Sequence, residues 1–232
     1  GFVGGIGTGA LFGGAAGGSK SFGLRWNLYK SCRDIAGYEA LLLRRTYPEL
    51  EETHLLAMAK EAETLGATYV KGERRMVFEN GSFVKAGHCE SKSDMSKMLS
   101  REYDEIAFDE ASTQEVEPIQ EISSRARSSK AAVESRGGAF VRFGSNPGGP
   151  AHLYLLDHFI TRAPDPLEYP RYRPEQYAFI KARVADNPYL SPRYVEERLD
   201  NLSDSRRKQL HDGDWSVFGS QFLPAWEPSK HV

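Results

Sequence analysis

The sequence has little of what marks a membrane-spanning, secreted or metal-clustering protein. Its purely apolar runs, such as Ala40 to Leu43, are far too short to cross a bilayer. The two cysteines, Cys32 and Cys89, lack metal-type spacing, which favours a reducing compartment such as the cytosol. Neither sign of charge dominates, because the sequence has 30 Lys and Arg residues and 32 Asp and Glu residues. Any surface that binds nucleic acid must therefore be local. The 232 residues suit one sizeable α/β domain, alone or with a small appendage.

Glycine, in contrast, is concentrated near the start of the chain. Residues 13–21 read Gly-Gly-Ala-Ala-Gly-Gly-Ser-Lys-Ser, between a short apolar run at 10–12 and apolar residues at helical spacing over 22–29. This order of strand, glycine loop, lysine, hydroxyl and helix is typical of a phosphate-binding loop. In such a loop Lys20 would reach the β- and γ-phosphates of ATP, and the Ser21 hydroxyl would ligate Mg²⁺. The predicted nucleotide-binding residues are Gly14, Ala15, Ala16, Gly17, Gly18, Ser19, Lys20 and Ser21.

The loop departs from the usual pattern at one position. Ser19 stands where the pattern has glycine, and its Cβ disfavours the left-handed backbone that glycine supplies there. We expect Gly17 and Gly18 to take the strained positions instead. The alternative interpretation is a flexible glycine linker that happens to contain a lysine.

A second signature lies further along the chain. The apolar run Ile106-Ala107-Phe108 ends in the adjacent carboxylates Asp109 and Glu110. Side chains alternate along a strand, so neighbouring carboxylates can serve one site only where the strand ends and the chain turns. Asp109 would hold Mg²⁺ through water, and Glu110 would polarise the water that attacks the γ-phosphate. An activated water argues against a small-molecule kinase.

The remaining pattern predicts a mainly parallel sheet flanked by helices. The predicted elements are a helix to about residue 35, a buried strand at 38–43, a helix opened by Pro48, a hairpin of 75–79 and 82–86 around Asn80-Gly81, a helix over 114–127, strands at 139–144 and 177–184, and helices opened by Ser191-Pro192 and by Ser203. We expect the hairpin to be an added edge of the sheet. His54 is expected at the surface or its boundary.

The strand at 139–144 delivers Ser145 and Asn146 to the same predicted edge as the carboxylates. A polar pair at that place could sense whether γ-phosphate is present. An ordinary turn is the alternative, because Asn-Pro-Gly-Gly is also a sequence common in turns.

Taken in order, these pieces resemble the ATPase domain of the large terminase subunit, the motor that packages DNA into tailed-phage capsids. The resemblance covers residues 11–226 and rests on the glycine loop at 13–21, Leu43-Arg44-Arg45-Thr46-Tyr47-Pro48, the carboxylate strand at 102–111, Asn146-Pro147-Gly148-Gly149, Asp186-Asn187-Pro188 and Gly213-Asp214-Trp215. It implies a P-loop NTPase of the RecA-like, additional-strand-glutamate type that uses ATP and Mg²⁺.

The resemblance also implies partners and a place of action. These are double-stranded DNA, the portal protein, the small terminase subunit and further copies of the chain in a ring, in the host cytoplasm and transiently at the procapsid portal. In such a ring a neighbour's arginine completes each site. Some relatives carry an arginine inside the phosphate loop, which residues 15–18 lack. Arg101 is our first candidate and Arg127 the second, with a plain surface charge as the alternative for each.

Two departures from the family bound this interpretation. Large terminase subunits normally continue into a nuclease with clustered acidic metal ligands, and no such cluster follows Trp226. We therefore expect no nuclease activity from this chain, an ATPase domain over 1–212 and an exit linker over 213–232. The upstream segment that usually packs on adenine is also not recognisable, which leaves base preference open.

Two other functions stay open on the sequence. Asp109-Glu110-Ala111-Ser112 also looks like a helicase box, so the chain could be one RecA-like lobe of a helicase or translocase. A nucleotide-dependent binding module without turnover is the third hypothesis. Candidate DNA-contacting clusters are Arg74/Arg75, Arg125/Arg127/Lys130 and Arg206/Arg207/Lys208.

Overall fold

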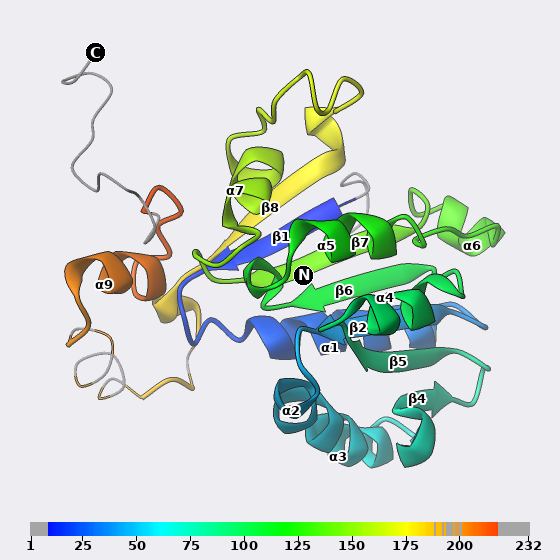
Figure 1. The fold of residues 1–232 in the computed structure, drawn as a ribbon. Helices are drawn as coiled ribbons and strands as arrows, with labels where there is room; N and C mark the ends of the chain where they lie inside the picture. The colour runs from blue at the N-terminus through cyan, green and yellow to red at the C-terminus, as the bar shows by residue number, and fades with distance from the viewer. Residues whose placement is uncertain are drawn as a thin grey trace.

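The computed structural model describes residues 9–217 except 188, 192, 194–196, 198 and 200 (Figure 1). These residues form one eight-stranded sheet in the order β3-β4-β5-β2-β6-β7-β1-β8. The six neighbouring strands β5, β2, β6, β7, β1 and β8 pair in parallel. At one edge β4 pairs antiparallel with β5, and β3 pairs antiparallel with β4. The strands are β1 (Gly9–Gly14), β2 (Glu39–Arg44), β3 (Ala67–Val70), β4 (Arg75–Phe78), β5 (Phe83–His88), β6 (Glu105–Asp109), β7 (Phe140–Ser145) and β8 (Tyr177–Ala182). The predicted mainly parallel α/β class is confirmed.

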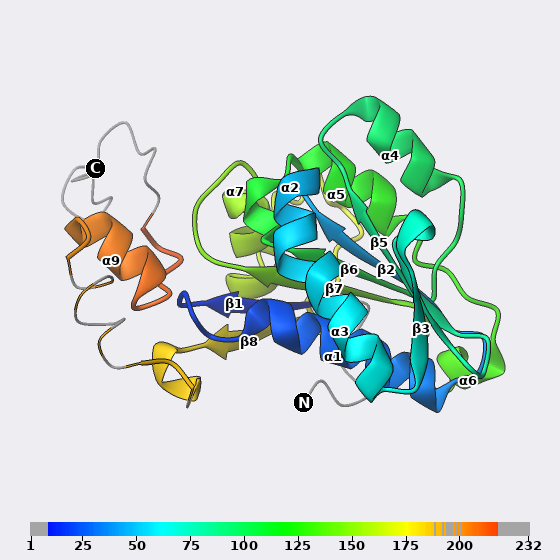
Figure 2. The same ribbon diagram turned by 90° about the horizontal axis from the view of Figure 1, so that it is seen from below.

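Helices cover both faces of this sheet. One face carries α1 and α3 and the other carries α4, α5 and α7, as the view along the sheet in Figure 2 shows. The helices are α1 (Lys20–Asp34), α2 (Tyr47–Leu50), α3 (Leu56–Thr64), α4 (Lys92–Leu99), α5 (Val116–Ser123), α6 (Ala131–Glu134), α7 (His152–Leu155) and α9 (Asp204–Leu210). A π-helical turn, Glu51–Leu55, joins α2 to α3 without a break, and a second one, Leu156–Ile160, follows α7.

The central strand β2 explains why both faces need cover. Its Leu42 packs into the core under α1 and α3, while Leu41 and Leu43 pack into the core under α4, α5 and α7. All three side chains are fully buried. A strand buried on both faces reads as a continuous apolar run, as the sequence predicts here.

The predicted hairpin is confirmed, but its place in the sheet differs from the expectation. Gly81 adopts φ 82° in the turn between β4 and β5, where glycine has no steric cost. β5 then pairs in parallel with β2, so it belongs to the parallel body of the sheet. Only β3 and β4 form the antiparallel addition.

The predicted helix over 114–127 is shorter in the structure. It ends at Ser123, because the next residues form backbone hydrogen bonds with Tyr103 instead of continuing the helix. The Tyr103 N–H donates to the carbonyl of Arg125 over 2.9 Å, and the Arg127 N–H donates to the carbonyl of Tyr103 over 2.9 Å.

The last described helix lies against the glycine-rich loop at residues 13–21. α9 begins after Ser203, as predicted, and the Ala16 N–H donates to the carbonyl of Leu210 at its end over 2.7 Å. The helix predicted to open at Pro192 falls largely outside the described residues. No described helix has the length and apolarity needed to span a bilayer.

Candidate active site

The candidate site lies at the carboxyl edge of the parallel strands. Strands β1, β7, β6 and β2 are neighbours in the sheet and end at Gly14, Ser145, Asp109 and Arg44 respectively. Parallel strands end at one edge, so the residues that follow them converge there, and ligands of open α/β sheets bind in that crevice. α1 starts at this edge from the loop after β1 (Figure 1).

The backbone of the glycine-rich loop turns through three residues with positive φ. Gly14 has φ 137° and Gly17 has φ 74°, while Ser19, at the start of α1, has φ 57°. The expectation that Gly17 takes a strained position is confirmed, whereas the one for Gly18 is wrong. Ser19 itself adopts the left-handed conformation, which costs a non-glycine residue about 1 kcal/mol. Gly14 is also needed for close approach, because a Cβ there would lie 2.4 Å from the Ala182 carbonyl oxygen of β8.

Lys20, the first residue of α1, points back into this loop. Its side chain is buried, and Nζ donates to the Ala15 carbonyl over 2.6 Å and to Asn146 Oδ1 over 2.7 Å. Burial lowers the pKa of Lys20, while the charges of Glu110 and Asp109 act in the opposite direction. The ammonium is therefore held where it can exchange a protein acceptor for a phosphate oxygen.

Ser21 and Asp109 meet as the sequence predicts. The Ser21 hydroxyl donates to Asp109 Oδ2 over 2.9 Å and lies 3.1 Å from Oδ1. Asp109 is almost fully buried at the end of β6. Burial raises its pKa, but the hydrogen bond from His54, the charge of Arg44 and the Ser21 hydroxyl outweigh burial and leave the pKa below its ordinary value. The pair offers one hydroxyl and one carboxylate to a hard cation.

Two residues that the sequence analysis gave no role also contact Asp109. Arg44 Nη1 lies 2.5 Å from Asp109 Oδ2, and His54 Nε2 lies 2.9 Å from the same oxygen. The expectation that His54 lies at the surface is wrong, because its side chain is fully buried. The signal was available: Leu50, His54 and Met58 recur at four-residue spacing, and all three are buried on one face of the continuous helix.

Glu110 follows Asp109 at a sharp turn of the backbone. Its φ of 48° lies in the left-handed region, which turns the chain so that both carboxylates face the site. Burial and the neighbouring Asp109 raise the pKa of Glu110, and Lys20 and Arg44 oppose that shift. A carboxylate with a raised pKa is a better proton acceptor than an ordinary glutamate.

Asn146 bridges the lysine and the second carboxylate. Its Oδ1 accepts from Lys20, and its Nδ2 lies 3.4 Å from both carboxylate oxygens of Glu110. Ser145 has a different task, since its hydroxyl accepts a hydrogen bond from the Ser112 N–H over 2.9 Å and is fully buried. Ser145 thus ties the end of β7 to the turn after Glu110.

The residues at this edge fit a nucleotide with Mg²⁺. A buried lysine, a glycine-rich backbone and a helix N-terminus suit phosphate oxygens. Among the described residues, no group of three or more His, Cys, Asp or Glu side chains could hold a metal ion by itself. Mg²⁺ does not require such a group, because it is usually bound through one or two protein oxygens together with phosphates and waters.

The two candidate arginine fingers lie at the opposite end of the parallel strands, where these strands begin. Arg101 precedes β6 and its Nε lies 2.8 Å from Glu39 Oε2 at the start of β2. Arg127 Nη2 lies 3.2 Å from Glu102 Oε1 at the same end. Neither arginine belongs to the site of its own chain. A role in the site of a neighbouring copy stays a prediction.

The basic clusters predicted to contact DNA differ in how they are paired. Arg75 Nη2 lies 2.7 Å from Glu73, and Lys130 Nζ lies 2.6 Å from the buried Asp104. For Arg206, Arg207 and Lys208 on α9, no acidic partner occurs within the described residues, and Arg206 donates to Gln209 over 3.0 Å.

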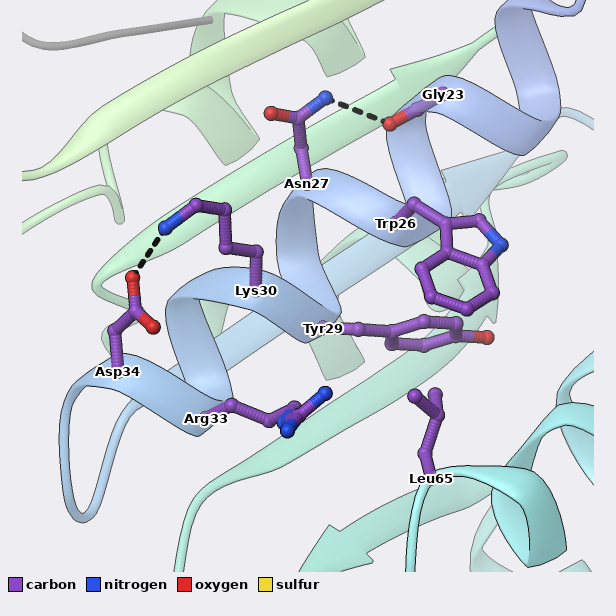
Figure 3. Close-up of a pocket in the computed structure, with 8 residues that line it drawn as sticks. All are labelled: Gly23, Trp26, Asn27, Tyr29, Lys30, Arg33, Asp34 and Leu65. Atoms are coloured by element: carbon purple, nitrogen blue, oxygen red, sulfur yellow. Dashed lines mark hydrogen bonds and ion pairs between the residues drawn. The ribbon is translucent and has the colours of Figure 1, made fainter. Parts of the chain in front are cut away.

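A separate cavity of about 640 Å³ opens beside α1, away from this edge (Figure 3). Its wall includes Trp26 and Tyr29 from α1 and Leu65 after α3, and the close-up shows the Tyr29 ring between the Trp26 ring and Leu65. None of Lys20, Asp109 and Glu110 lines it. The Tyr29 hydroxyl donates a hydrogen bond to Glu61 over 2.7 Å.

Comparison with known proteins supports the fold. No protein-family profile and no curated protein sequence matches the chain. Among solved structures, the large terminase of a thermophilic bacteriophage superposes with a TM-score of 0.66 at 13% identity, over 90% of this chain and 48% of that one. Its complex with ATP-gamma-S gives a TM-score of 0.64 at 13% identity, with 90% and 47% of the two chains covered.

The ATPase domain of the Thermus phage P74-26 large terminase gives a TM-score of 0.61 at 13% identity, and here 91% of this chain and 90% of that one are covered. The chain spans about half the length of the thermophilic-phage terminase. The fold is that of phage large terminase ATPase domains, so the resemblance predicted from the sequence is confirmed at the level of the fold.

Proposed function

We propose that this chain is the ATP-hydrolysing unit of a viral DNA-packaging motor of the large terminase kind. The observation that carries the proposal is that Lys20 and Ser21 meet Asp109 and Glu110 at one edge of the sheet. Ser21 and Asp109 are 88 residues apart in the sequence. A flexible linker would not bury its lysine between a loop carbonyl and Asn146. The shared fold with phage large terminases, one of them solved with ATP-gamma-S, supports the same conclusion.

In this proposal each side chain has a distinct role. Lys20 and the backbone of residues 14–19 bind the phosphates, and Ser21 with Asp109 holds Mg²⁺. Bound Mg²⁺ neutralises charge on the phosphate oxygens during transfer. Glu110 accepts a proton from the attacking water, a task suited to its raised pKa.

Asn146 is placed to report on the state of the site. It bonds to Lys20 and lies beside Glu110, so a phosphate that takes a donor from Lys20 changes the partners of Asn146. Ser145 and Gly149 fasten the same loop to the turn after Glu110, because Ser145 accepts from the Ser112 N–H and Gly149 lies against the Ser112 carbonyl. We assign Ser145 and Asn146 to coupling on these contacts.

Glu110→Gln tests the catalytic assignment. We expect nucleotide affinity within about twofold of wild type, because the amide keeps the shape of the side chain, and hydrolysis reduced by about 10²–10⁴-fold, because the proton acceptor is lost. Binding is measured with a fluorescent ATP analogue and turnover by phosphate release. Glu121→Gln, at an exposed position of α5, is the matched control. Unchanged turnover in Glu110→Gln contradicts the catalytic role, and no turnover by wild type favours a binding module.

The partners follow from the motor interpretation. Double-stranded DNA would meet a basic surface, and Arg206, Arg207 and Lys208 on α9 suit it best because α9 also touches the phosphate loop at Ala16. Assembly as a ring, docking on a portal protein, contact with a small terminase subunit and action in the host cytoplasm belong to the same proposal. The ATPase domain over 1–212 with a linker from 213 is proposed with it. The first residues of that linker would pack on the domain, because Trp215 is buried against His152 and Phe179.

A further inference from the structure

Behind Asp109 lies a buried chain of polar side chains that the proposed mechanism does not use. His54 touches Asp109 with Nε2, and its Nδ1 lies 3.2 Å from Arg25 Nη1. Arg25 is held in turn by Glu61, with Nε 3.0 Å from Oε2 and Nη2 2.9 Å from Oε1, and by the Thr53 carbonyl at 3.2 Å. Arg25 and His54 are buried and Glu61 is partly buried, and all three are hydrogen-bonded within the network. A satisfied network of this kind holds its members in fixed orientations.

The chemistry of Arg25 determines how His54 is used. A guanidinium has five N–H donors and no acceptor. Nδ1 of His54 must therefore accept from Arg25, which leaves the ring proton on Nε2, where it donates to Asp109 Oδ2. Arg25 sets the tautomer, and the two-pronged contact with Glu61 fixes Arg25.

The donors around Asp109 are unevenly distributed. Oδ2 accepts from His54, Arg44 and Ser21, whereas Ser21 is the only described donor that reaches Oδ1. Oδ1 therefore keeps more free acceptor capacity than Oδ2. In the proposed function, Oδ1 and the Ser21 hydroxyl are the groups that would hold Mg²⁺.

The position of His54 depends on a local irregularity of the helix. His54 lies in the π-helical turn Glu51–Leu55 between α2 and α3. An extra residue in one helical turn changes the direction of the side chains that follow, and such turns are frequent at functional sites. Here the turn lies in the connection between β2 and β3, and its histidine contacts a carboxylate on β6.

We propose that His54, oriented by Arg25 and Glu61, is a positioning residue that holds the Asp109 carboxylate in the orientation required for Mg²⁺. The inference rests on the proposed function, because it assigns His54 a role in the same nucleotide site. Partners that orient a metal-binding side chain typically change metal affinity or activity by about 10–100-fold when they are removed.

The test compares His54→Gln with His54→Met. Glutamine places an amide N–H near the position of Nε2, whereas methionine fills the same space without a donor. The probe is a fluorescent ATP analogue titrated with Mg²⁺. We expect His54→Met to need about 10–100-fold more Mg²⁺ for half-maximal nucleotide binding, and His54→Gln to stay within about threefold of wild type. Binding in excess EDTA should be equal in all three proteins, because the phosphate loop is intact.

A second variant covers the case in which methionine prevents folding, as judged by circular dichroism and melting temperature. His54→Asn keeps an amide next to Arg25 but is too short to reach Asp109, so we expect the Mg²⁺ requirement of His54→Met from a folded protein. An unchanged Mg²⁺ requirement in His54→Met or His54→Asn overturns the proposal, and so does an equal loss in His54→Gln. Absence of nucleotide binding by wild type would instead contradict the proposed function itself.

Discussion

At the scale of single residues, the most heavily contacted group in the site is the Asp109 carboxylate. It is buried and accepts from Ser21, Arg44 and His54. A buried carboxylate is stable only when it is paired and hydrogen-bonded. Arg44 supplies charge that compensates this carboxylate, and under the proposed function Mg²⁺ would add charge at the same group.

Arg44→Gln tests that balance of charge. Removing one member of a buried ion pair costs about 3–5 kcal/mol, and the remaining donors to Asp109 reduce the expected loss to about 2–3 kcal/mol. The measurement is the free energy of unfolding in urea at neutral pH. Mg²⁺ with nucleotide should stabilise this variant more than wild type, because the metal replaces the lost charge.

Arg45→Gln is the matched control, since the Arg45 side chain is exposed and its described hydrogen bond goes to the Thr113 carbonyl. Equal losses in Arg44→Gln and Arg45→Gln would show that the charge on Asp109 is not compensated by Arg44.

At the scale of elements, the loop after β7 depends on a close contact of two backbones. A Cβ on Gly149 would lie 2.3 Å from the Ser112 carbonyl oxygen, and the φ of Gly149 is 89°. Gly137 has a similar φ of 100° and no atom within 4 Å of a Cβ. The two positions share the backbone strain and differ only in the contact.

Gly149→Ala should therefore destabilise more than Gly137→Ala. We expect about 1 kcal/mol for Gly137→Ala from the positive φ, and about 1–3 kcal/mol more for Gly149→Ala from overlap with Ser112. Urea unfolding of both variants measures the difference. Gly149→Ala should also lower ATP turnover in the folded protein, because the turn after Glu110 must shift. Equal stability of the two variants would exclude a tight contact.

The contact between α1 and α3 depends on pH through Glu61. Burial raises the pKa of Glu61, but hydrogen bonds from Arg25 and Tyr29 outweigh it, so the pKa lies below its ordinary value. A carboxylate with a depressed pKa contributes stability above its unfolded pKa and loses it as pH falls through the folded pKa. The contribution is therefore complete at pH 7 and declines below about pH 4.5.

We expect Glu61→Gln to cost about 1–3 kcal/mol at pH 7 and progressively less as the pH falls below about 4.5. Urea unfolding across pH checks this, with Glu63→Gln on the exposed side of α3 as control. A stability difference between wild type and Glu61→Gln that stays constant down to pH 3 would rule out this ion pair as the cause.

The elements also show how much was readable from the sequence. Strands β1, β2 and β6 and the start of α1 were predictable, because buried parallel strands are apolar runs and Lys20-Ser21 marks a helix start. The π-helical turn was not predictable, since nothing in Glu51–Leu55 announces an extra residue. The burial of His54 was readable from its spacing to Leu50 and Met58. The contacts of His54 and Arg44 with Asp109 were not, because only the packed sheet and helix define those distances.

At the scale of the whole molecule, Arg101 and Glu110 lie at opposite ends of the parallel strands. Arg101 pairs with Glu39 at the amino end of β2, whereas Glu110 follows the carboxyl end of β6. One copy cannot bring both to one nucleotide. A finger role for Arg101 therefore requires a head-to-tail contact between copies, which generates a ring when it closes.

Mixing two inactive variants tests this arrangement. Arg101→Ala lacks the proposed finger but keeps Glu110, and Glu110→Gln keeps Arg101. If Arg101 acts on the neighbour's nucleotide, the mixture should recover up to about a quarter of wild-type turnover at interfaces that combine the two intact residues. Arg127→Ala replaces Arg101→Ala in the parallel experiment for the second candidate. Full activity of Arg101→Ala alone would contradict its role.

The buried position of Trp215 makes its fluorescence a usable probe of this molecule. Its indole stacks on His152 at 5.3 Å, and its Cζ2 lies 3.0 Å from where a Cβ on Gly13 would be, at the start of the glycine-rich loop. Any rearrangement of that loop would change the surroundings of this indole. The chain thus carries an intrinsic fluorophore at the loop. Under the proposed function, its emission would report the binding and release of nucleotide in real time without a label.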